Sequence, residues 1–110
     1  MNTNDPIDIV RHFAKEIQNG RSLGDIHRHG QREMVELNDE ILAIKYPEQF
    51  TPGPDGVVGE AIDVMACMLD LIFVEAPETT NEEICAILLR KCEKWARRYK
   101  DSIDGDRSIE

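Results

Sequence analysis

The run GEAIDVMACMLDLIFV, residues 59–74, is the most apolar stretch of the chain, yet it carries the three carboxylates Glu60, Asp63 and Asp70. Fourteen of residues 57–74 are apolar, so a helix made by this segment can expose little of its surface to water. Each acid near a bilayer centre costs roughly 2.5–3.5 kcal/mol, whereas a large aliphatic residue gains only about 0.3–0.6 kcal/mol. The run therefore predicts a helix buried against other helices, with no membrane as a partner.

The acids of this run are not scattered around the predicted helix. At about 100° per residue, the three carboxylates fall within roughly 80° of one another. The preceding segment REMVELNDEIL repeats the pattern, with Glu33, Glu36 and Glu40 within roughly 60°. An apolar stripe lies beside them, made of Met34, Leu37, Ile41 and Ile44. If the apolar stripes of the two helices pack together, we expect the two acidic stripes to meet at the edge of that interface.

Start and stop signals predict helices over residues 6–20, 23–45, 57–75 and 80–100, and no segment alternates like a strand. Asp5 can cap the first helix with Pro6 at its first position, and Thr80 and Glu83 have capping-box spacing. Residues 46–56, YPEQFTPGPDG, form a loop rich in proline and glycine. We expect an all-α four-helix bundle, with one domain over residues 1–100 and a flexible tail over 101–110.

Charge is concentrated in the middle of the chain. The net charge is −9, and residues 31–75 hold ten acids but only two bases, Arg32 and Lys45. No basic stretch suits a nucleic acid partner. The N-terminus lacks a signal-peptide pattern, and Cys67, Cys85 and Cys92 lack metal or disulfide spacing, so we expect a cytoplasmic protein with reduced core thiols. A core of this size also favours a homodimer or larger oligomer.

Six acids on two neighbouring faces must protonate, pair with bases or bind a cation. Two carboxylates about 5 Å apart repel by roughly 3 kcal/mol at an effective dielectric constant near 20. Two nearby bases cannot pair with all of them, and carboxylates are the ligands that Mg²⁺ and Mn²⁺ prefer. A solvated acidic face stays an alternative. A di-iron site requires Glu-x-x-His pairs, and neither Glu36 nor Glu60 has a histidine three residues later.

The order of two short motifs resembles a known superfamily. EMVEL carries Glu33 and Glu36, EAIDV carries Glu60 and Asp63, and a loop with parts of two helices separates them. Glu-x-x-Glu followed by Glu-x-x-Asp on the next helix is similar to the pattern of MazG-like all-α nucleoside triphosphate pyrophosphohydrolases. The resemblance covers about residues 25–100. It implies that the four acids hold Mg²⁺, with Mn²⁺ as a substitute, against a triphosphate whose α-phosphorus is attacked by water.

The resemblance also implies roles for single residues. Glu36 is the candidate for orienting or deprotonating the water, although sequence alone does not separate a base from a ligand. Members of the superfamily carry bases near an asparagine on a later helix, where this chain has Trp95. The candidates for phosphate binding are Lys91, Lys94 and Arg98. The alternative is that these bases complement the helix dipole, with Trp95 in the core.

Some polar residues keep two interpretations. Asp70 and Glu40 are either groups behind the metal ligands or salt-bridge partners of the C-terminal bases. His27 and His29 either border a nucleotide pocket or are exposed residues near the start of a helix. Each alternative depends on neighbours that lie far away in sequence.

The expected function is Mg²⁺-dependent hydrolysis of nucleoside triphosphates or deoxynucleoside triphosphates to the monophosphate and pyrophosphate, which would clear unwanted nucleotides. A related dUTP or dCTP hydrolase would share the metal site and differ in base preference. The alternative is a non-enzymatic helical interaction protein, whose acidic face binds a basic partner or a structural cation. The sequence does not indicate the preferred base or the number of metal ions.

Overall fold

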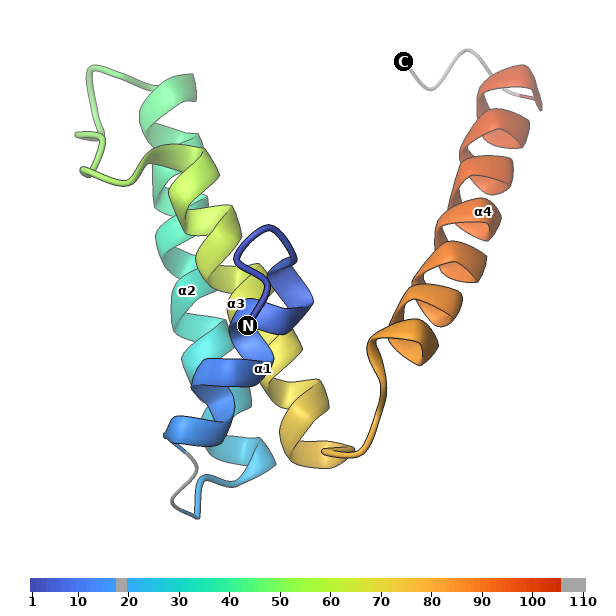
Figure 1. Ribbon diagram of the computed structural model, residues 1–110. Helices are drawn as coiled ribbons and strands as arrows, with labels where there is room; N and C mark the ends of the chain where they lie inside the picture. The colour runs from blue at the N-terminus through green and yellow to red at the C-terminus, as the bar shows by residue number, and fades with distance from the viewer. Residues whose placement is uncertain (18–19, 106–110) are drawn as a thin grey trace. The chain divides into compact units, whose positions relative to one another are not determined.

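The computed structural model describes residues 1–17 and 20–105, and four helices lie within them (Figure 1). They are α1 (Pro6–Glu16), α2 (Leu23–Lys45), α3 (Gly56–Glu75) and α4 (Asn81–Gly105). No strand occurs in these residues, so the predicted all-α class is confirmed. None of the helices found there is long and apolar enough to cross a membrane.

Side-chain caps mark the starts of α1 and α4. The Asp5 carboxylate accepts a hydrogen bond from the Ile7 amide at 3.0 Å, with Pro6 at the first helical position as the sequence predicts. The Thr80 hydroxyl accepts from the Glu83 amide at 3.1 Å, which confirms the predicted cap of α4. These caps satisfy amides that have no partner inside the helix, so local sequence is sufficient to locate them.

Two helix ends differ from the sequence prediction. α1 ends at Glu16 rather than near Gly20, and residues 18–19 lie outside the described part of the chain. α4 continues to Gly105, five residues beyond the expected end at Lys100, so residues 101–105 of the predicted tail are helical. Residues 106–110 of that tail lie outside the described residues.

The chain divides into two compact units, Met1–Glu78 and Thr79–Glu110. In the first unit α2 and α3 run side by side, and α1 packs on α3 (Figure 1). Ala14 of α1 and Phe73 of α3 are buried, and the Arg11 guanidinium lies 4.4 Å from the centre of the Phe73 ring. The second unit consists mainly of α4. The first unit therefore holds the two helices that carry the acidic motifs.

The face of α2 that packs against α3 differs from the expected one. The buried positions of α2 are Ile26, Gly30, Glu40 and Ala43, with Glu33 and Leu37 partly buried. Of the stripe expected at the interface, Met34, Ile41 and Ile44 are exposed, the last of them by 73%. α2 is thus rotated so that its acidic face, and not its apolar stripe, lies against α3.

A glycine at the interface gives the physical reason for this orientation of α2. A Cβ atom on Gly30 would lie 3.7 Å from the Cβ of Cys67 and 2.9 Å from the terminal methyl of Met68. The two helices therefore approach each other closely where α2 has no side chain, and close packing there favours burial of the Gly30 face. The same rotation places the carboxylates of both helices in the interface.

The cysteines are free thiols in different environments. Cys67 is buried in the interface of α2 and α3, as expected of a core thiol. Cys85 and Cys92 are exposed on α4, so the expectation of core thiols is wrong for these two. The reason is that α4 is an isolated helix within its own unit, where apolar neighbours in sequence do not amount to a core.

Candidate metal centre

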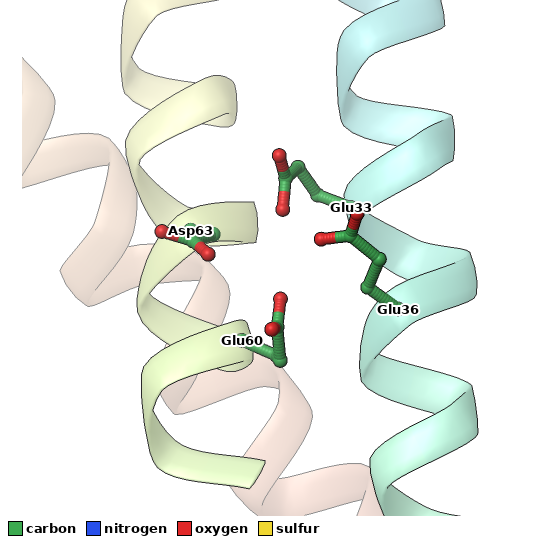
Figure 2. Close-up of side chains that lie close together, drawn as sticks. All are labelled: Glu33, Glu36, Glu60 and Asp63. Carbon is green, nitrogen blue, oxygen red and sulfur yellow. The ribbon is translucent and has the colours of Figure 1, made fainter. Parts of the chain in front are cut away.

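Four carboxylates from two helices meet between α2 and α3. Glu33 and Glu36 extend from α2, and Glu60 and Asp63 extend from α3 (Figure 2). One oxygen of each side chain lies within 4.8 Å of one oxygen of every other. The i, i+3 spacing places both acids of each pair on one helix face, and helix packing then brings the two faces together. The four residues predicted as metal ligands are therefore adjacent in the structure.

Exposure to water differs across this four-carboxylate cluster. Glu60 is only 7% exposed, Glu33 is partly buried, and Glu36 is exposed. One carboxylate oxygen of Glu33 and one of Glu60, both Oε2, are buried without a hydrogen-bond partner. A buried oxygen with no partner has lost its hydration without compensation. The cluster therefore has a closed inner side, formed by Glu60, and an outer side open to water at Glu36.

Burial and mutual repulsion raise the pKa values of the inner carboxylates. The pKa of Glu60 rises to about 7, first because burial disfavours the charged form, and then because of Glu36 and Asp63. Burial likewise raises the pKa of Glu33, helped by a hydrogen bond and repulsion from Glu36. Near neutral pH and without a cation, ionisation of Glu60 and Glu33 is therefore unfavourable.

One contact of the cluster was not anticipated in the sequence. His29 Nε2 lies 3.1 Å from Glu33 Oε1, and His29 Nδ1 lies 3.6 Å from the sulfur of Cys67. Burial, followed by nearby carboxylates, raises the pKa of the Cys67 thiol, so the thiol stays protonated at neutral pH and can donate to Nδ1. Nε2 then donates to Glu33. The i, i+4 spacing of His29 and Glu33 on one helix is the signal that could have identified this pair.

The two acids with open interpretations have partners other than those considered. Asp70 forms a two-pronged ion pair with Arg21, at 2.5 and 3.0 Å, between residues 49 positions apart. Glu40, 8% exposed, accepts a hydrogen bond from the Gly53 amide at 2.6 Å, which ties α2 to the loop before α3. Asp70 is therefore a salt-bridge partner of Arg21, while pairing of either acid with the bases of α4 stays a prediction.

The candidates for phosphate binding, Lys91, Lys94 and Arg98, are exposed on α4. Trp95, which the alternative interpretation places in the core, is exposed as well. These residues belong to the unit Thr79–Glu110, while the four carboxylates belong to Met1–Glu78. Their assignment to a phosphate stays a prediction.

A cavity of about 390 Å³ borders the cluster. Glu33 and Asp63 belong both to the cluster and to the wall of the cavity. Most of the apolar residues in the cavity wall come from α1, including Phe13 and Ala14. The volume of the cavity lies within the range of about 300–1,000 Å³ typical of small-molecule sites. A molecule seated in this cavity would reach the carboxylates at one end.

The donor set fits a divalent cation that prefers oxygen ligands. Four carboxylates converge, two of their oxygens are buried without partners, and His29 is the one potentially cationic side chain that contacts them among the described residues. Mg²⁺ and Mn²⁺ suit such oxygen ligands, and Mg²⁺ typically keeps positions for water and phosphate. In their absence, ionised carboxylates at this spacing repel each other.

Comparisons with known proteins add no name to this site. A scan against protein-family models finds no match for the chain, and searches of curated proteins and of solved structures find none.

Proposed function

We propose that this protein is a divalent-cation-dependent nucleotide pyrophosphohydrolase, which converts a nucleoside or deoxynucleoside triphosphate to the monophosphate and pyrophosphate. The observation that carries the proposal is the convergence of Glu33, Glu36, Glu60 and Asp63, with the Oε2 atom of buried Glu60 unpartnered. A stability role alone does not account for such a cluster, since each additional ionised carboxylate raises its electrostatic energy. The resemblance of the two motifs to MazG-like enzymes agrees with this proposal.

The four carboxylates divide into holding and reacting groups. Glu33, Glu60 and Asp63 would hold Mg²⁺, or Mn²⁺ in its place, and the bound cation would supply positive charge to the phosphate oxygens. Glu36 is exposed at the open side, where water reaches it. A carboxylate there can accept the proton of the attacking water.

The proposed hydrolysis requires only the nucleotide and one water molecule as reactants. The water oxygen forms a bond to the α-phosphorus, and the bond from the α-phosphorus to the oxygen bridging to the β-phosphorus breaks. Pyrophosphate carries away that bridging oxygen. The Glu36 carboxylate takes one proton of the water and then releases it to solvent, and the second proton leaves the new monophosphate to solvent. Lys91, Lys94 and Arg98 remain candidates for neutralising the leaving phosphates.

Release of pyrophosphate tests the proposal. The four common deoxynucleoside triphosphates, each with Mg²⁺, should yield monophosphate and pyrophosphate in equal amounts. Asp63→Asn should abolish this release, while Asp39→Asn should not, because Asp39 is an exposed acid of α2 outside the cluster. Folded wild-type protein that releases no pyrophosphate from any of these nucleotides would contradict the proposal.

The exposed apolar residues support a second copy of the chain as a partner. Exposed positions of α3 include Val58, Ile62 and Met65, and those of α2 include Met34 and Ile44. Apolar positions with helical spacing on both helices suit packing against another pair of helices. A dimer or tetramer in sedimentation equilibrium would support self-association, and a monomer at high micromolar concentration would exclude it.

The same exposed apolar positions favour the second candidate function, a non-enzymatic helical interaction protein. Thermal melting separates the two candidates. An enzyme should be stabilised jointly by Mg²⁺ and a non-hydrolysable nucleotide, because each ligand binds the folded state. An interaction protein with a structural cation should respond to Mg²⁺ alone.

A further inference from the structure

We propose that the cavity lined by α1 receives the nucleoside part of the substrate. The cavity selects the nucleoside by shape and apolar contact, so it distinguishes the four bases only weakly. This inference rests on the proposed function, because it takes the phosphates to lie at the four-carboxylate cluster. It adds a base site, the residues that form it and the expected degree of selectivity.

The position of the cavity follows from residues that it shares with the cluster. Glu33 and Asp63 line the cavity and are also members of the cluster. A nucleotide with its phosphates at these carboxylates would therefore have its nucleoside next to the cavity. A volume of about 390 Å³ is within the range for small-molecule sites, so the nucleoside has a defined place to enter.

The apolar part of the cavity wall suits a flat ring. α1 contributes Ile9, Val10 and Phe13 to this wall, Ile17 follows directly after α1, and Ala66 of α3 adds a small side chain. Phe13 is 50% exposed, so one part of its ring faces the open space. Bases stack on aromatic rings whatever their hydrogen-bonding edges, because every base has a π-face. Phe13 is therefore the residue that we assign to base stacking.

The polar groups in the wall already have partners. Both carboxylate oxygens of Asp70 accept hydrogen bonds from Arg21, at 2.5 and 3.0 Å. Both ring nitrogens of His29 are engaged, one with Glu33 and the other with Cys67. Among the described wall residues, the groups outside the cluster that could read the edge of a base are thus committed elsewhere.

This lack of uncommitted polar groups determines the expected selectivity. Sites that hydrogen-bond their ligand reject analogues by about 10⁴–10⁵-fold, whereas apolar pockets discriminate by roughly 10–200-fold. The wall of this cavity belongs to the second kind. We expect the affinities of the four deoxynucleotides to differ by less than about 200-fold.

Binding measurements with non-hydrolysable probes test the inference. The probes are the α,β-imido analogues of dATP, dGTP, dCTP and dTTP, with inorganic tripolyphosphate as the base-free probe, all with Mg²⁺ and followed by calorimetry. Each nucleotide should bind more tightly than tripolyphosphate. Phe13→Ala should weaken nucleotide binding by about 5- to 150-fold, the value of one stacking contact, and leave tripolyphosphate binding unchanged.

A second variant and a matched control keep the test decisive. Ala66→Phe would fill the cavity and should weaken nucleotide binding selectively. Ala86→Phe makes the same change on α4, at an exposed position outside the cavity wall, and should leave nucleotide binding unchanged. Circular dichroism would check that each variant is folded. If Ala66→Phe is unfolded, Phe13→Ala alone decides, because a half-exposed ring is dispensable for the core.

The possible failures can be told apart. If tripolyphosphate binds with Mg²⁺ but nucleotides bind no tighter, or the Phe13→Ala variant loses nothing, the cavity is not the base site while the proposed function stands. Preference for one base by more than about 200-fold would overturn the inferred weak selectivity. If wild-type protein binds neither probe, both this inference and the proposed function fail.

Discussion

Two acidic regions of the same helix, α3, have opposite electrostatic environments. Asp70 is neutralised within the chain by Arg21, through two hydrogen bonds. Glu60 and Asp63, two to three turns earlier, face Glu33 and Glu36 and have no basic partner among the described residues. Acids that serve the fold thus have a partner supplied by the protein. In the four-carboxylate cluster, the contact that the described residues provide is that of His29 with Glu33, and this difference supports the proposed cation.

The largest effect expected from this comparison is on catalysis. Glu36→Gln keeps the shape of the side chain but removes its ability to accept a proton, so kcat should fall by about 10²–10⁴-fold, the usual contribution of a general base. The melting temperature should not fall, because the substitution relieves repulsion in the cluster. Steady-state pyrophosphate release and thermal melting measure the two quantities. A Glu36→Gln variant with wild-type kcat would remove Glu36 from the reacting role.

The next effect concerns stability at the paired acid. Asp70→Asn should lower the free energy of unfolding by about 1.5–3 kcal/mol, the range for a hydrogen bond to a charged group. The substitution leaves Arg21 partly buried without its anionic partner. Urea denaturation gives the free energy. The matched change at the cluster, Glu60→Gln, should not destabilise the metal-free protein at pH 8, and equal losses at both positions would end the distinction between the two regions.

The smallest effect is the pH dependence of the stability difference between the Glu60→Gln variant and the wild type. The folded-state pKa of Glu60 is raised to about 7 from 4.5, so the folded state binds the proton more tightly than the unfolded state. The contribution of Glu60 to stability is therefore fully present below pH 4.5 and is lost as the pH rises through about 7. Without Mg²⁺, Glu60→Gln should gain melting temperature relative to wild type between pH 5 and pH 8. A constant difference across this range would show that Glu60 is not strained by its neighbours.

Much of the architecture could be read from local patterns. Asp5, Pro6, Thr80 and Glu83 located two helix starts correctly, because capping depends on atoms within a few residues. The i, i+3 spacing of the two acidic motifs predicted two pairs on single helix faces, and these pairs do meet in space. Local sequence could not predict the partner of Asp70, because Arg21 is 49 residues away.

The sequence by itself determined which residues share a helix face, since the helical repeat of 3.6 residues is fixed by the backbone. Only the tertiary structure decided which face of α2 is inside. Two adjacent faces competed, one with the apolar stripe Met34, Ile41 and Ile44, the other with Gly30, Ala43 and the acids. The second face lies inside because a glycine lets α3 approach closely, a property of the pair of helices and not of either one alone. That choice placed the carboxylates within the interface.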